Sequence, residues 1–91
     1  SDFEIEEFQL SNNPQYLSAI QGRSLAELEL GRRSGALVLA IRNQGRLIAN
    51  PGGDMELAPG QLLIVLGSKL QLSRFQQLLG EAVDSIETMP G

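Results

Sequence analysis

The sequence predicts a small α+β domain, in which a mixed or antiparallel β-sheet with one hairpin packs against two short helices. Two observations predict this class. Two apolar runs are joined by a short turn segment, and two serines each stand before a stretch with helical periodicity. The chain has 91 residues, of which 42% are hydrophobic. This composition suffices for one modest core and not for two folded domains.

The N-terminal segment, residues 2–10, alternates apolar and polar residues from Phe3 to Ile5, and the pattern then slips by one before Phe8. This slip indicates a strand that contains a bulge or a change of face. Residues 11–14 are expected to end the strand, because their two asparagines and their proline disfavour regular backbone pairing.

The first helix is expected after a loop, where Ser24 and Glu27 have the spacing of a capping box. Leu25 and Leu28 lie on one face of this helix. Gly31 is suited to end it, so the pattern predicts about two turns.

The β-hairpin is predicted from the apolar runs 36–41 and 46–49, which a short segment rich in polar residues connects. Gly45, within that segment, supplies the positive φ that such turns need. The two strands are therefore expected to be antiparallel neighbours.

The C-terminal half is expected to contain a type II turn at residues 58–61, a strand at residues 62–66 and a second helix. Ser68 is the expected N-cap of this helix, and Gly80 is expected to end it. Its apolar stripe consists of Leu72, Phe75, Leu78 and Leu79.

The apolar runs 36–41 and 62–66 are continuous, which is typical of strands that are covered on both faces. Two short helices cover only one face, and Leu70 lies on the side of its helix away from Leu72. A second copy of the domain, or a neighbouring part of a larger protein, is expected to cover the other face.

Several function classes are disfavoured by composition. The chain has no cysteine and no histidine, so we expect neither an enzyme of the common nucleophilic kinds nor a metal site. Glu4, Glu6 and Glu7 are not expected to form a calcium site, because calcium needs about six to eight oxygen ligands and no further acidic residue is close in sequence. They are expected on a solvated strand face. The formal charge of −4 predicts no nucleic-acid partner. The apolar runs are far shorter than the roughly 20 residues of a membrane-spanning helix, so no direct membrane insertion is expected.

The residues that carry a family resemblance form three segments, 22–28 (GRSLAEL), 38–45 (VLAIRNQG) and 57–67 (LAPGQLLIVLG). In this order and spacing they make the chain resemble the TrkA-C domain, the C-terminal lobe of RCK modules, which regulate potassium channels and transporters. One departure is Gln61, where family members usually carry an aspartate. The resemblance covers residues 1–80, with a core at 22–80, and leaves residues 81–91 as an acidic C-terminal tail.

The resemblance implies a regulatory domain that forms a homodimer in the cytoplasm and acts on the membrane-embedded channel or transporter portion of a larger protein. In some relatives the ligand of this lobe is cyclic di-AMP, bound across the dimer interface. Cyclic di-AMP is therefore the candidate ligand here, and no cofactor is expected in this segment itself. The alternative is a purely structural assembly domain of a cation antiporter or another carrier, without a small-molecule ligand.

The candidate ligand site lies around the hairpin. A cyclic dinucleotide carries two phosphates and two bases, so a two-fold site needs a cation and an amide from each subunit beside apolar surface. The residues that could supply these groups are Ile41, Arg42, Asn43, Arg46 and Asn50. The alternative is that the polar ones are ordinary solvated turn residues.

The charge is divided unevenly along the chain. Residues 22–80 hold all seven basic residues and four acidic ones, a net of +3, whereas the two ends hold seven acidic residues and no basic one. The overall charge of −4 thus belongs to the ends. An anionic ligand is compatible with the central block.

Overall fold

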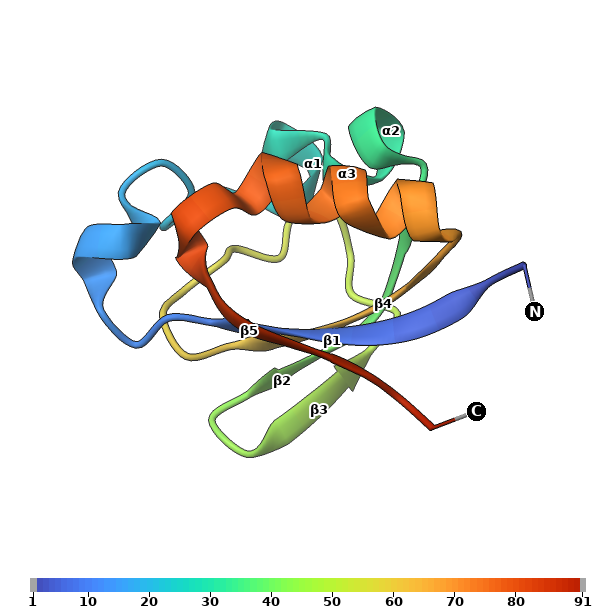
Figure 1. Ribbon diagram of the computed structural model, residues 1–91. Coiled ribbons are helices and arrows are strands. Elements are labelled where there is room, and N and C mark those ends of the chain that lie inside the picture. The colour runs from blue at the N-terminus through green and yellow to red at the C-terminus, as the bar shows by residue number, and fades with distance from the viewer. Residues whose placement is uncertain (1, 91) are drawn as a thin grey trace.

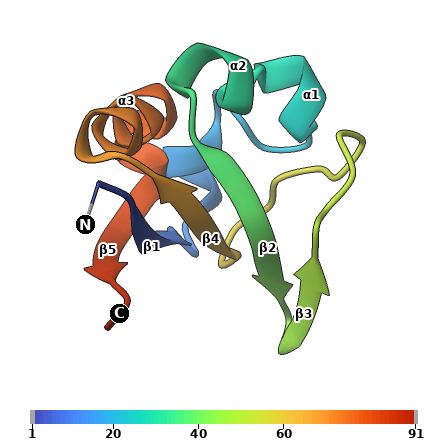
Figure 2. The ribbon, with the colours of Figure 1, turned by 90° about the vertical axis from the view of Figure 1, so that its right-hand side faces the viewer.

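A computed structural model describes residues 2–90 as one five-stranded antiparallel sheet with helices on one of its faces (Figure 1). In chain order the elements are β1 (Glu4–Leu10), the 3-10 helix η1 (Pro14–Leu17), α1 (Leu25–Leu28), α2 (Leu30–Ser34), β2 (Leu37–Asn43), β3 (Arg46–Ala49), β4 (Leu62–Gly67), α3 (Lys69–Leu79), the 3-10 helix η2 (Gly80–Ala82) and β5 (Val83–Thr88). The strand order across the sheet is β3-β2-β4-β1-β5, as Figure 2 shows. The predicted α+β class is confirmed.

The first helical region starts as the sequence predicts. The Ser24 side chain accepts a hydrogen bond from the Glu27 amide at 3.1 Å, and the Glu27 carboxylate accepts one from the Ser24 amide at 2.9 Å. The hydrogen bond that the Ser24 amide donates to the carboxylate lowers the pKa of Glu27, because it favours the charged form.

The end of this region differs from the prediction. Glu29 adopts a left-handed conformation, with φ of 52°, and divides the segment into the single turn α1 and the short helix α2. The helix therefore does not end at Gly31, which lies inside α2; Gly35, with φ of 80°, ends it instead. Glycine adopts this left-handed conformation without steric cost, so Gly35 is suited to end α2.

The predicted hairpin is confirmed as β2 and β3. Gln44 and Gly45 form its two-residue turn with φ of 51° and 80°, and Asn43 pairs with Arg46 across it. Two successive positive φ values match the right-handed twist of the flanking strands.

The turn before β4 is held by a buried side chain. Gly60 has φ of 80°, as a type II turn requires, and Gln61 is only 1% exposed. Gln61 Oε1 accepts from the Ala58 amide at 2.9 Å, and its Nε2 donates to the Glu56 carbonyl at 3.2 Å. Gln61, the departure from the aspartate usual in the family that the sequence resembles, thus stabilises the turn through two side-chain hydrogen bonds.

Replacing Gln61 with alanine is expected to lower the free energy of unfolding by about 1–3 kcal/mol, because it leaves two backbone groups without their partner. Urea denaturation measures the loss. Gln77→Ala, at an exposed position of α3, is the matched control and should change stability by less than about 0.5 kcal/mol. A Gln61→Ala variant as stable as this control would contradict the role given to the side chain.

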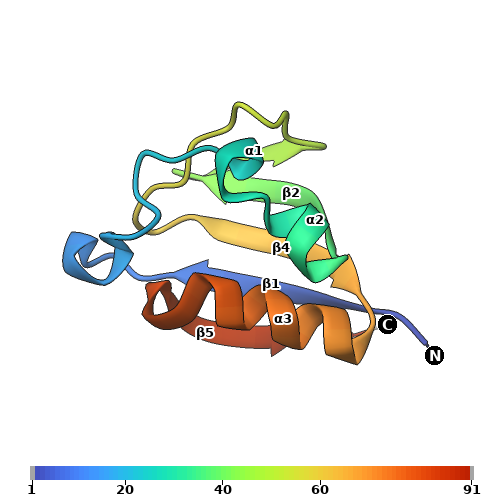
Figure 3. The same cartoon turned by 90° about the horizontal axis from the view of Figure 1, so that it is seen from above.

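The second predicted helix is confirmed as α3, which lies along the sheet above β1 and β5 (Figure 3). Ser68 caps it by accepting from the Gln71 amide at 3.1 Å, and the Gln71 side chain accepts from the Ser68 amide at 2.8 Å. Leu72, Phe75 and Leu79 point into the core.

Removing this cap by Ser68→Ala is expected to cost about 0.5–2 kcal/mol, because the Gln71 amide loses its acceptor. Ser73→Ala is the matched control within the same helix, since Ser73 is exposed and alanine is the better helix former. Thermal unfolding of both variants checks this. Equal melting temperatures would show that the cap contributes nothing.

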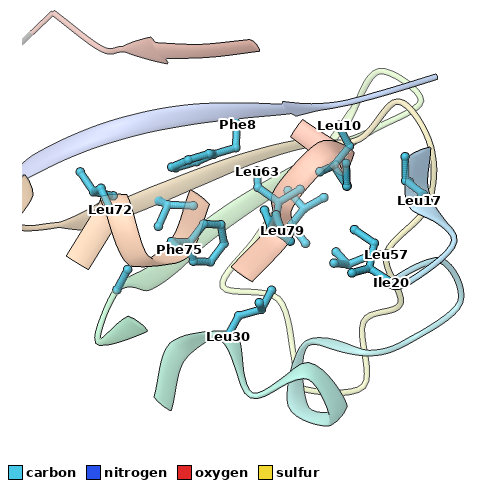
Figure 4. Close-up of a cluster of buried hydrophobic side chains, with 14 residues drawn as sticks. Phe8, Leu10, Leu17, Ile20, Leu30, Leu57, Leu63, Leu72, Phe75 and Leu79 are labelled. Atoms are coloured by element: carbon cyan, nitrogen blue, oxygen red, sulfur yellow. The ribbon is translucent and has the colours of Figure 1, made fainter. Parts of the chain in front are cut away.

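The core lies between the helices and the sheet (Figure 4). At its centre the rings of Phe8 from β1 and Phe75 from α3 are 5.0 Å apart, tilted by 53° to each other, and both side chains are fully buried. Leu63 and Val65 complete the sheet side of this layer from β4.

Residues 83–88, expected to lie in an acidic tail, form the edge strand β5 beside β1. Phe8 pairs with Ile86 and Leu10 with Val83, and a register shift lies between Gln9 and Leu10. Because of this irregularity, the two apolar residues of β5 are three positions apart, so the alternation that would have indicated a strand is hidden.

The slip in the apolar pattern of β1 reflects a change in the face of the sheet to which its apolar side chains point. Phe8 lies opposite Leu63 on the helix side, whereas Ile5 lies opposite Leu66 on the other side of the sheet. The helices leave this other side, which we call the outer face, without cover in the described part of the chain (Figure 2). Within residues 2–90 no helix has the length and apolar character needed to cross a bilayer.

Candidate functional site on the β2–β3 hairpin

The predicted site residues fall into four environments. Arg42 is exposed and lies opposite Leu47 on β3 and Leu62 on β4. Because Leu63, the neighbour of Leu62 along β4, is fully buried on the helix side, Arg42 belongs to the outer face. Its guanidinium thus stands beside two apolar side chains, of which Leu47 is 51% exposed.

Asn43 and Arg46 form the pair that closes the hairpin, and they project to the face opposite Arg42. The hairpin extends away from the helices there, so Arg46 is exposed and Asn43 half-buried (Figure 2). The hairpin end therefore presents one guanidinium on each of its two sides.

Ile41 is fully buried and packs in the core, where it pairs with Ile48 and Leu63. It positions Arg42 and Asn43 from beneath and offers no surface of its own. The apolar surface beside Arg42 comes from Leu47 and Leu62, which the sequence reasoning did not select.

Asn50 lies at the far end of β3 from the hairpin turn. It adopts a left-handed conformation, with φ of 49°, and its amide donates to the Leu39 carbonyl at 2.8 Å. At about 3.3 Å per residue, the length of β3 separates Asn50 from Arg46 by roughly 13 Å. Within one subunit the structure therefore does not bring the five predicted residues together.

Asn50 instead borders an open groove of about 360 Å³ between the first helices and the start of β2. The other residues lining it are Leu25, Ala26, Glu29, Gly31, Arg32, Ala36, Leu37, Val38, Pro51 and Gly53. No sequence pattern indicates this groove, because its walls come from separate elements whose residues are typical of ordinary helices and strands.

Charge at this groove is provided by Glu29 and Arg32, which are joined by a two-pronged ion pair. The hydrogen bond from Arg32 lowers the pKa of Glu29, and the same bond raises the pKa of Arg32. Both groups are charged at neutral pH and largely satisfy each other. Within residues 2–90, Arg42 and Arg46 of the hairpin form no such ion pair.

Metal chemistry is given no support by the carboxylates of β1. Glu7 projects on the outer face, whereas Glu4 and Glu6 project on the opposite one, so the three carboxylates do not share a face. Among residues 2–90 there is no group of three acidic side chains that could hold a metal ion.

The domain thus combines a sheet face without helices over it and a hairpin that carries two arginines. Residues 16–80 match the family model of the TrkA-C domain, so the chain belongs to the TrkA-C family of regulatory domains. The resemblance seen in the three sequence segments is thereby confirmed. No match was found among curated proteins.

Solved structures similar to this chain are RCK C domains. The RCK_C domain dimer of S. agalactiae BusR in complex with c-di-AMP has 23% identity and a TM-score of 0.73, covering 87% of this chain and 93% of that one. The RCK C domain of the potassium transport protein KtrA, also in complex with c-di-AMP, has 24% identity and a TM-score of 0.70, covering 84% and 82%. These likenesses establish the RCK_C fold.

Two further structures concern longer proteins. The GsuK channel bound to NAD is 25% identical, with a TM-score of 0.67, over 86% of this chain and 14% of the channel chain. BusR in complex with its busAB-promoter DNA matches over 84% of this chain and 35% of that one. The sequence-based expectation of no nucleic-acid partner is therefore not supported, because a relative in fold belongs to a protein that binds DNA.

Proposed function

We propose that this chain is the ligand-sensing, dimerising domain of a cytoplasmic regulator of a potassium channel or transporter, and that its ligand is cyclic di-AMP. The observation that carries the proposal is the hairpin. It presents Arg42, next to apolar side chains, on one side and Arg46 on the other, in a block of net charge +3. Two similar RCK C domains, those of BusR and KtrA, are solved with c-di-AMP.

Two copies of the chain together can bring close the site residues that lie apart within one subunit. Within a subunit Asn50, at the far end of β3, is separated from Arg42 and Asn43 at the hairpin end, so a compact site that contains all three residues draws them from two subunits. Cyclic di-AMP has two equivalent phosphates and two equivalent bases, which suits a two-fold arrangement of such groups.

Regulation follows from differential affinity. A ligand shared between subunits biases the attached channel or transporter only if it binds one dimer geometry more tightly than another. Coupling of this kind is typically about 1–3 kcal/mol, which changes an equilibrium by a factor of roughly 5–150.

The proposal is tested by thermal unfolding of the domain with a panel of nucleotides. Cyclic di-AMP at 100 times its dissociation constant is expected to add about 2.7 kcal/mol of stability, whereas linear dinucleotides and AMP should add less. An unchanged melting temperature with every nucleotide would favour the alternative function, a structural assembly domain without a small ligand. Light scattering that shows only monomers at tens of micromolar would contradict both.

A further inference from the structure

The acidic residues of the two chain ends, which the ligand proposal does not use, meet in the folded domain. β1 carries Glu4, Glu6 and Glu7, and its neighbour β5 carries Asp84 and Glu87. The hairpin with its arginines lies at the opposite edge of the sheet, since the strand order is β3-β2-β4-β1-β5 (Figure 2). One edge of the sheet is therefore basic and the other acidic.

Two of these carboxylates repel each other. Glu7 and Glu87 lie directly opposite each other on β1 and β5, and like charges in this position destabilise a strand pair. Within residues 2–90 neither side chain forms an ion pair, and Glu87 is exposed. A cation placed beside them by another molecule would relieve this repulsion, so the pair favours a basic partner.

β5 is an edge strand, and no strand of the described chain pairs with its free side. The Met89 amide donates to the Ile5 carbonyl at 2.9 Å, so Glu87, two positions before Met89, also bonds to β1. The backbone groups of the alternate residues, Ile86 and Thr88, point away from β1. They are directed so that they can bond to an additional strand.

A hollow of about 430 Å³ lies at the end of β5. Its apolar lining includes Phe3, Ile5, Leu66 and Met89. Met89 and Glu87 are two positions apart, so they lie on the same face of the sheet. An additional strand that places a basic side chain opposite Glu87 thus places the side chain two positions away beside the hollow, where a long apolar residue fits.

We propose that the free edge of β5 binds an extended segment of another protein, antiparallel to β5, in which an apolar residue stands two positions before a basic one. A second copy of this chain does not fit. Pairing of two β5 edges would bring Asp84 and Glu87 of both copies together, and β5 contains no basic residue. The other edge strand, β3, has Gln44 two positions before Arg46 and so lacks the apolar residue. The inference does not depend on cyclic di-AMP, whose proposed site lies at the opposite edge.

Fluorescence anisotropy of the whole 91-residue chain with a labelled peptide of repeated Leu-Thr-Lys-Thr tests the charge of the edge. Glu87→Lys is expected to weaken binding about tenfold, because it replaces an attraction across the strands with a repulsion. The new lysine also pairs with Glu7, so the variant should melt no lower than the unmodified chain and its weaker binding does not come from unfolding.

Glu56→Lys is the matched control, since it changes the net charge equally at an exposed position that bridges to Ser24, outside the sheet. Its affinity for the peptide should stay within about threefold of the unmodified chain. Equal affinities of the two variants, or no binding to the unmodified chain at high micromolar protein, would overturn the proposal.

N-methylation of the peptide separates strand addition from attraction between charges alone. The peptide presents its threonines opposite Ile86 and Thr88, so N-methyl groups on the threonines are expected to abolish measurable binding. N-methyl groups on the leucines and lysines, whose amides point away from β5, should leave the affinity within about threefold. Equal binding of the two methylated peptides would overturn strand addition to β5.

Discussion

Phe75→Ala is expected to lower the free energy of unfolding by about 3–5 kcal/mol. Phe75 is fully buried at the middle of α3, and its ring lies 5.0 Å from that of Phe8. Alanine there leaves a cavity at the contact between the helix layer and the sheet, which loses both burial and the aromatic pair.

The effect should be large relative to the whole stability of such a domain, which is of the order of 5–15 kcal/mol. Chemical denaturation followed by circular dichroism measures it, with Gln76→Ala, an exposed position next to Phe75, as the control. A loss below about 1 kcal/mol would show that α3 is not held to the sheet by this contact.

Arg42→Glu is expected to weaken cyclic di-AMP binding at least a hundredfold. In a two-fold site the substitution acts twice, and each lost bond between a guanidinium and a phosphate contributes about 1.5–3 kcal/mol. The sum exceeds the roughly 2.8 kcal/mol that corresponds to a factor of one hundred. The new carboxylates also repel the phosphates.

Arg74→Glu is the matched control, since Arg74 is an exposed arginine on α3, away from the hairpin. Its affinity for cyclic di-AMP should stay within about threefold of the unmodified chain, apart from the general effect of net charge. Calorimetric titration of both variants gives the comparison. Equal affinities of Arg42→Glu and Arg74→Glu would remove Arg42 from the site.

Much of the fold could be predicted because its signals are local. The capping box at Ser24, the N-cap at Ser68 and the positive φ of Gly45 depend on residues within a few positions of one another, and each is found as expected. The strand β5 could not be predicted, since its register depends on an irregularity opposite β1 that no local pattern reveals.

The candidate site was only partly accessible from the sequence. Arg42 and Arg46 are exposed at the hairpin as expected from their place in a turn. The sequence predicts Ile41 as ligand surface, but alternation along β2 places its side chain in the core, and which face is the core face depends on where the helices pack. The groove beside Asn50 is formed by long-range packing, for which the sequence has no periodic signal.

The central claim is that two copies of this chain share one cyclic dinucleotide. Isothermal titration calorimetry of the domain with cyclic di-AMP tests it most directly. A saturable heat with one ligand bound per two chains is the result we expect. Binding of one ligand to every chain would contradict the shared site, and no heat at high micromolar protein would contradict ligand sensing itself.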